Sequence, residues 1–402
     1  MKIDLWDPQS FAHGHPHAQY AWLRDNDPVH FQEEPNGPGF WAITRYQDVY
    51  DVDRGFQAFS SEPTIMIQDA PDQATNFGGY KMMLMMDPPQ HTAYRRLIRE
   101  EFTVPVTAGR IPRMKQLARQ IVDEVIERGE CDFVSQVAGE MPSYVIAELL
   151  GIPLEDGREL YKWTEAIHTT AGGSPTEEGM VAVFKMFEYG RKVIEEKRAR
   201  PKDDLATKLL HVEVDGKKLD DMEFLLFFLL LIDAGGDTTR NLLSSGMIAM
   251  LENPDQLNWL KADLSGRLNS AREELLRWCS PVIYMRRRAR RDVEVGGKKL
   301  REGDKAVMYF GSANRDPQKF ADADKLDLSR TPNEHIAFGS GPHVCLGQHI
   351  ARIEIDAMLI EVLTRMKDFR LAGEPKWLPS NFISGPQVMP VRFTPARRMA
   401  EV

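Results

Sequence analysis

Phe338-Gly339-Ser340-Gly341-Pro342-His343-Val344-Cys345-Leu346-Gly347 is the stretch that decides the fold. Three glycines surround one cysteine, and glycine lets a backbone turn tightly and approach a flat ligand closely. Residues 348–366 follow with apolar side chains mostly at three- and four-residue steps, which predicts an amphipathic helix. Cys345 therefore precedes a helix N-terminus. Unpaired N–H groups and the helix dipole favour a thiolate there, the form that binds a metal or attacks an electrophile.

Two other interpretations of this cysteine are open on the residues alone. A lone cysteine is commonly a small, buried hydrophobic side chain. A zinc site could use His343, Cys345 and His349, but it lacks a second ligand cluster and leaves the glycines unexplained.

The whole pattern, Phe-Gly-x-Gly-x-His-x-Cys-x-Gly, resembles the haem-binding signature of the cytochrome P-450 superfamily, the haem-thiolate monooxygenases. Every fixed position of the signature is filled. The resemblance implies haem b (heme b, iron protoporphyrin IX) as the cofactor, Cys345 as the iron ligand, and Phe338 and Gly347 as parts of the haem-binding loop. It also implies one mainly α-helical domain with small β-sheets over residues 1–402.

Composition sets only broad limits. The chain of 402 residues is 42% hydrophobic and 28% charged, as in soluble globular proteins. Its net charge of −9 argues against nucleic acid as a partner. The three cysteines are too few for a disulfide framework, which favours a reducing cytoplasm. No apolar signal region opens the chain, and its longest apolar run, residues 224–232, is too short to span a bilayer, so we expect no membrane anchor.

Asp87-Pro88-Pro89 predicts the start of a helix that carries His91 and Arg95. These two side chains lie four residues apart, on one helical face, and together could hold a carboxylate. The resemblance implies that both contact the haem propionates, together with His343 and with Arg287 of a strand predicted at residues 282–287. Arg96 and Arg99 point elsewhere. They could form a basic surface for an acidic electron donor, or simply a solvated face.

A second helix is predicted from residues 220 to 253, and its middle reads Asp233-Ala-Gly-Gly-Asp-Thr-Thr239. Two adjacent glycines weaken a helix, and local opening could leave room for a diatomic ligand. On this heptapeptide alone, a kinked helix with a back-bonding threonine is the simpler interpretation. The motif is similar to the oxygen-activation sequence of the family, which implies catalytic roles in proton delivery for Asp237 and Thr238. Asp233 has no assigned role.

Glu274 and Arg277 form an i, i+3 pair, which alone would be a surface ion pair of small effect. The resemblance implies that this Glu-x-x-Arg joins Arg330 in a buried network. We therefore assign these three residues to structure, with haem retention depending on them.

The substrate cavity is expected to be apolar. An irregular, methionine-rich stretch at residues 60–86 is a candidate lid. The resemblance implies a cavity wall that includes Ala234, Ile283, Met285, Phe382 and Ile383, which favours a hydrophobic terpenoid, steroid or fatty-acyl substrate. The C-terminal sequence is similar to bacterial members that act on terpenes and sterols.

The resemblance implies reductive activation of O2 and insertion of one oxygen atom into a C–H bond. The chain has no flavin or iron–sulfur signature, so NAD(P)H-derived electrons would come through a separate ferredoxin or flavodoxin partner. Two alternatives stay open: a peroxide-driven peroxygenase, and a non-catalytic haem sensor or electron carrier.

Overall fold

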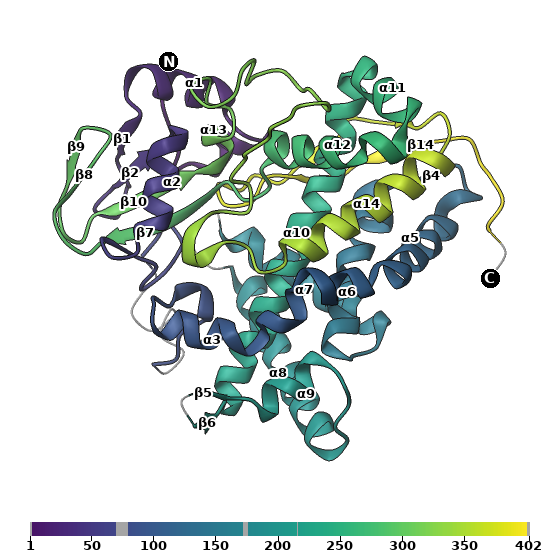
Figure 1. Ribbon diagram of the computed structural model, residues 1–402, viewed down its shortest axis with the longest axis horizontal. Helices are drawn as coiled ribbons and strands as arrows, with labels where there is room; N and C mark the ends of the chain where they lie inside the picture. Colours follow the sequence, from purple (N-terminus) through teal and green to yellow (C-terminus); the bar gives the residue numbers. More distant parts are fainter. Residues whose placement is uncertain (1, 70–78, 172–175, 215, 400–402) are drawn as a thin grey trace.

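The chain divides into a small β-rich part and a larger helical part in the computed structural model, which describes residues 2–69, 79–171, 176–214 and 216–399. The β-rich part lies on the left in Figure 1, and the helices fill the centre and the right. This arrangement agrees with the predicted mainly α-helical fold with small β-sheets.

The main sheet has five strands in the order β1-β2-β10-β7-β3. β1 and β2 form the antiparallel hairpin that the alternation of residues 29–44 predicts, and β10 joins β2 in parallel. Apolar side chains on one face of the sheet pack against α2 (Tyr46–Arg54). Ile65 and Ile67 cover the other face. The strand bounds are β1 Val29–Gln32, β2 Phe40–Ile43, β3 Phe59–Ser60, β7 Tyr284–Ala289 and β10 Lys305–Tyr309.

Short elements and helices occupy most of the remaining chain. The longer helices are α1 His17–Asn26, α3 Gln90–Ile98, α5 Ile111–Ile126, α6 Glu140–Leu150, α7 Leu154–Ala171, α8 Glu177–Ala199, α10 Asp221–Glu252, α11 Pro254–Ala262, α12 Leu264–Cys279 and α14 Gln348–Arg365. The shorter ones are η1 Pro8–Phe11, η2 Met83–Met85, η3 Arg99–Phe102, α4 Val104–Gly109, η4 Val134–Ala138, α9 Leu205–His211, α13 Phe310–Ala313 and η5 Gly341–His343. The minor strands are β4 Glu130–Asp132, β5 Glu213–Val214, β6 Lys217–Lys218, β8 Val293–Val295, β9 Lys298–Leu300, β11 Arg370–Leu371, β12 Lys376–Trp377, β13 Pro386–Val388 and β14 Pro390–Arg392.

α10 is the central helix of the helical part, and its 32 residues span about 50 Å. It begins with a capping box: Asp220 accepts from the Glu223 N–H at 2.9 Å, and Glu223 accepts from the Asp220 N–H at 2.8 Å. The expected opening at Gly235 and Gly236 is absent, since the helix runs unbroken from Asp221 to Glu252. Side chains of α6 and α7 support both glycines; a Cβ on Gly236 would lie 3.4 Å from the Tyr161 ring. The glycines thus permit close helix packing.

Glu274 and Arg277 lie in α12 without any exposed side-chain surface. Two hydrogen bonds of 2.8 Å join their side chains, and Arg330 adds a third contact to Glu274 at 3.1 Å. Asn333 also donates to Glu274, at 3.0 Å. The remaining Arg277 donors reach the carbonyl oxygens of residues 314, 323 and 325. The network therefore ties α12 to the segment that leads into the Cys345 loop.

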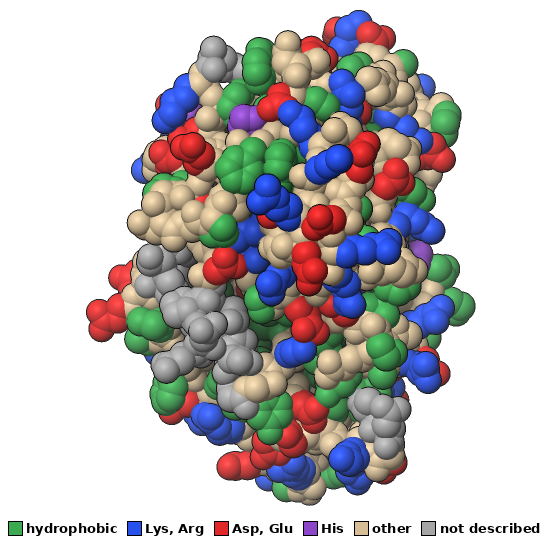
Figure 2. All heavy atoms as spheres, turned by 90° about the vertical axis from the view of Figure 1, so that its left-hand side faces the viewer, with side chains coloured by type: hydrophobic (Ala, Val, Ile, Leu, Met, Phe, Trp, Pro, Cys, Tyr) green, Lys and Arg blue, Asp and Glu red, His purple; other side chains and the backbone are tan. Residues whose placement is uncertain are grey.

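The outer surface mixes charges of both signs. Figure 2 shows one face, on which acidic and basic side chains alternate over short distances. In the part of the chain that the structure describes, every helix is too short or too polar to cross a membrane.

We predict that Glu274→Ala destabilises the fold by about 3–5 kcal/mol, because it leaves the Arg277 charge buried without its carboxylate. The matched control is Glu159→Ala, which removes an exposed ion pair with Lys162 and should cost less than about 1 kcal/mol. Chemical denaturation of both variants measures the difference. Equal, small losses would contradict the structural assignment.

Candidate active site

The Cys345 loop folds back on itself in front of α14. The Cys345 N–H donates to the Phe338 carbonyl oxygen at 2.8 Å, which closes the loop. Gly341 has φ +64°, and a Cβ there would approach the Arg54 Cα to 2.9 Å. A glycine is therefore required where the loop crosses the end of α2. Gly347 is the N-cap of α14, as the sequence predicts.

Two opposing effects act on the Cys345 thiol. Burial raises its pKa, whereas hydrogen bonds from the Gly347 and Gln348 backbone N–H groups and the charges of Arg95 and Arg352 lower it. Burial is the larger effect. The N–H groups at the start of α14 lower the pKa of the thiol, as the sequence predicts, but burial outweighs them. A bound metal cation would favour the thiolate further.

Four basic side chains gather beside the loop from three separate segments. The His91 ring of α3 stacks on the His343 ring with centroids 3.9 Å apart. Arg95 donates to the Val344 carbonyl oxygen at 2.6 Å, and Arg287 of β7 donates to Asp53 at 2.7 Å. The structure thus brings together all four residues that were predicted to contact propionates.

The electrostatics of this cluster favour an anionic ligand. Burial, with the charges of Arg287, His91 and Arg95, lowers the pKa of His343 to about 2. Burial, with Arg95 and Arg287, lowers that of His91 to about 4. The buried His91 Nδ1 has no hydrogen-bond partner among the described residues. Both histidine rings are therefore neutral near pH 7, and Arg95 and Arg287 carry the positive charge. A sulfur ligand beside two arginines and two imidazole rings fits a flat metal complex that carries carboxylates at its rim, as haem does.

The middle of α10 has side-chain surface exposed on one side. Ala234 is exposed and Thr238 half-buried within a helix whose neighbouring turns are buried. The Thr238 hydroxyl donates to the Ala234 carbonyl oxygen at 3.2 Å, the back-bonding that the sequence left open. Asp237 is buried and forms an ion pair with Arg240 at 3.1 Å. The threonine and the acid of the motif thus occupy adjacent but different environments.

The predicted cavity wall is only partly exposed. Met285 is half-buried, while Phe382 and Ile383 are buried in a cluster that also holds Ile65 and Ile67. Ile283 has no exposed surface. The same apolar cluster encloses Ile283, and its place in the cavity wall stays a prediction. Part of the candidate lid, residues 70–78, lies outside the described residues.

Comparison with known proteins identifies the fold. The sequence profile of cytochrome P450 matches residues 173–381. A steroid C26-monooxygenase of Mycolicibacterium smegmatis is 38% identical over 400 residues, covering 98% of this chain and 96% of the relative. The chain belongs to the cytochrome P450 family. It is a P450 monooxygenase, and the family implies haem as cofactor and use of O2.

Further relatives of this P450 extend the comparison. A methyl-branched lipid omega-hydroxylase of Mycobacterium bovis is 36% identical over 391 residues, 93% of this chain and 90% of the relative. The solved structure of Mycobacterium marinum cytochrome P450 CYP268A2 in complex with pseudoionone superposes with a TM-score of 0.91 at 35% identity. That superposition covers 98% of this chain and 99% of the other.

Sequence reasoning missed two charged groups near the motif. Glu354 of α14 is buried and accepts a hydrogen bond from the Thr239 side chain, and burial raises its pKa to about 7. Arg240 links Asp237 to α7. A glutamate on the apolar face of the helix after Cys345 could have indicated the first; no sequence signal indicates the α7 contact.

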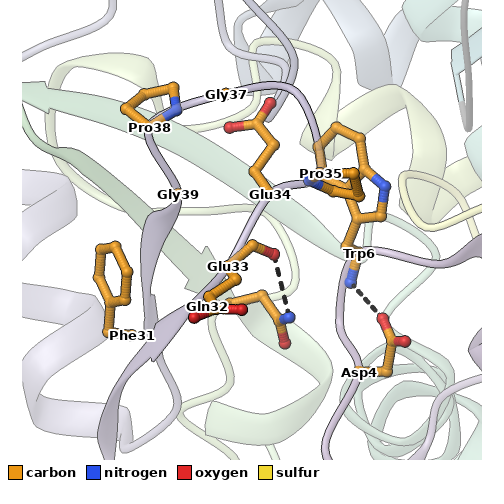
Figure 3. A pocket seen from close by; sticks show the side chains of 10 residues that line it. All are labelled: Asp4, Trp6, Phe31, Gln32, Glu33, Glu34, Pro35, Gly37, Pro38 and Gly39. Atoms are coloured by element: carbon orange, nitrogen blue, oxygen red, sulfur yellow. Dashed lines mark hydrogen bonds between the residues drawn. The ribbon is translucent and has the colours of Figure 1, made fainter.

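A surface hollow lies away from the predicted site residues. It measures about 500 Å³ and lies between the N-terminal segment and the β1–β2 hairpin (Figure 3). Its walls include Trp6 and Phe31 beside Asp4, Glu33 and Glu34. None of the predicted site residues lines it.

We predict that Arg95→Ala releases haem about tenfold faster, because a charge-assisted hydrogen bond contributes about 1.5–3 kcal/mol. Arg96→Ala is the matched control, since Arg96 is an exposed neighbour on the same helix. Transfer of haem to an excess of apomyoglobin measures both rates. Identical rates in the two variants would remove Arg95 from the haem site.

Proposed function

We propose that this P450 hydroxylates a lipid-like molecule of steroid, terpenoid or fatty-acyl type. The observation that carries the proposal is the exposed surface of Ala234 and the half-buried Thr238 in the middle of α10, where the neighbouring turns are buried. Apolar Met285, Phe382 and Ile383 support a hydrophobic ligand. The two relatives named above, a steroid C26-monooxygenase and a methyl-branched lipid omega-hydroxylase, point to the same class.

The residues around Cys345 would hold the cofactor. His91, Arg95, Arg287 and His343 would bind its propionates, and the Cys345 sulfur would ligate its iron. When bound, thiolate-ligated haem supplies the activation of O2, because the anionic sulfur pushes electron density to the iron and favours O–O cleavage. Hydrogen bonds from the Gly347 and Gln348 N–H groups to the sulfur would reduce the electron density that it donates to the iron.

Asp237 and Thr238 would deliver protons. The Thr238 hydroxyl lies on the partly exposed side of α10 and has one proton to donate. Asp237 precedes it directly and holds a carboxyl group that can replace this proton. Because Asp237 is fully buried, its own protons have to arrive through neighbouring groups or water.

A separate protein would supply electrons derived from NAD(P)H. We favour a ferredoxin or flavodoxin, both of which present acidic surfaces that complement exposed arginines. Arg96 of α3 and Arg99 of η3 are exposed, and Arg99 is near enough to Arg95 for its charge to act on that residue. Val104 and Val106 of α4 are exposed nearby in the chain. A basic surface with apolar residues suits such a transient complex.

The function is tested first with ligands. A library of steroids, terpenoids and branched fatty acids should contain members that shift the haem spin state, and those members should be hydroxylated with NAD(P)H and a redox partner. Turnover that needs only hydrogen peroxide would instead support the peroxygenase. Binding without any turnover would support a sensor or carrier.

For the same reaction, we predict that Asp237→Asn lowers product formation about 100-fold, the low end of general acid catalysis. The lost product should appear as hydrogen peroxide, because two protons still arrive from water but no longer at the oxygen atom that has to leave as water. Thr238→Ala should raise peroxide in the same way. Unchanged product per NAD(P)H in both variants would contradict the proton-delivery roles.

A further inference from the structure

One guanidinium group connects the acid of α10 to the neighbouring helix α7. Arg240 Nη2 lies 3.1 Å from Asp237 Oδ1. Arg240 Nη1 donates to Glu165 and to the Tyr161 hydroxyl oxygen, both on α7. The Tyr161 hydroxyl in turn donates to Glu165 at 3.3 Å. Two carboxylates from two helices thus share one cation.

The two carboxylates differ in their access to water. The Asp237 and Arg240 side chains are 1% and 2% exposed, whereas that of Glu165 is 39% exposed. Burial lowers the pKa of Arg240 to about 9, opposed by the charge of Asp132 in β4. In such a weakly screened place, each contact of Arg240 with one carboxylate weakens its hold on the other.

α7 packs directly against this part of α10 (Figure 1). The Tyr161 ring lies against Gly236, the residue before Asp237. The cation also lies over the Tyr161 ring, with 5.1 Å between the guanidinium carbon and the ring centroid. Any shift of α7 along α10 therefore changes the Arg240 contacts with Tyr161 and Glu165.

We propose that Glu165 is a positioning residue for proton delivery: it draws Arg240 toward α7 and so determines how strongly Arg240 holds Asp237 in its charged form. The inference rests on the proposed role of Asp237 in proton transfer. Only a proton moves in this step, from the Asp237 carboxyl toward the Thr238 hydroxyl, and solvent returns it. The position of α7 against α10 thereby regulates how readily the Asp237 carboxyl takes up a proton.

The charged and titratable groups around the Arg240 guanidinium come from each packed element. They are Tyr161 and Glu165 of α7, Asp132 of β4, and Asp237 of α10 itself. Glu165→Gln keeps the size of the side chain but removes its charge. The full attraction of Arg240 then acts on Asp237, so the Asp237 carboxyl should titrate about one pH unit lower, a tenfold change.

The titration of Asp237 is measured by infrared difference spectroscopy on protein with 13C-labelled aspartate. The band lost in Asp237→Asn identifies the carboxyl. Glu165→Gln should shift its midpoint downward, and Glu165→Asp, which keeps the charge, should return it toward the wild-type value. Glu159→Gln is the matched control on the same helix, where the pair with Lys162 is exposed. A wild-type midpoint in Glu165→Gln would overturn the proposal.

The holoenzyme gives a second readout. Glu165→Gln should raise the share of electrons released as hydrogen peroxide several-fold, while Glu159→Gln leaves that share unchanged. Substrate affinity from the spin-state shift should be unaltered in both, which separates positioning from damage to α7. If Asp237→Asn itself releases no larger share of its electrons as hydrogen peroxide than the wild-type enzyme does, the proposed proton relay fails. If Asp237→Asn uncouples and Glu165→Gln does not, only the Glu165 proposal fails.

Discussion

The structure is built around the cost of holding one sulfur anion away from water. The loop that carries Cys345 is enclosed by Phe338, α2 and α14, and enclosure disfavours a charged sulfur. The protein offsets part of this cost with two backbone N–H groups and two guanidinium groups, but not all of it. Coordination to haem iron would supply the remainder, since a metal-bound thiol loses its proton. The fold and the cofactor therefore stabilise each other.

Packing around α10 and α14 determines where the reacting groups lie. α14 begins three residues after Cys345, and its buried Glu354 accepts a hydrogen bond from Thr239 on α10. On the other side, the Glu274 network holds the segment that leads into the loop through Arg330 and Asn333. One continuous set of contacts thus positions both the Cys345 sulfur and the exposed side of α10 at Thr238. Small displacements of either helix would affect both.

Local sequence signals predicted several helices and strands, and they placed Cys345 directly before a helix. The helix after Cys345 and the β1–β2 hairpin depend on neighbouring residues, so periodicity and turn residues suffice to find them. The family resemblance also placed His91, Arg95, Arg287 and His343 in one cluster. These residues come from three separate segments, so no local pattern could have joined them.

Long-range packing explains what the sequence did not indicate. The Gly235-Gly236 pair suggested an open helix, but α6 and α7 press on both sides and keep α10 regular. No sequence pattern indicated that Ile65 and Ile67 join Ile283 in one apolar cluster. Glu165 lies 75 residues from Arg240 in the chain, and only the docking of α7 reveals their contact.

The bond between Cys345 and iron is tested most directly by the absorption spectrum of the reduced protein under carbon monoxide. Thiolate ligation predicts a strongly red-shifted Soret band for the wild-type protein and its loss in Cys345→Ser. A wild-type spectrum without that shift, or a shifted band that survives the substitution, would contradict the account.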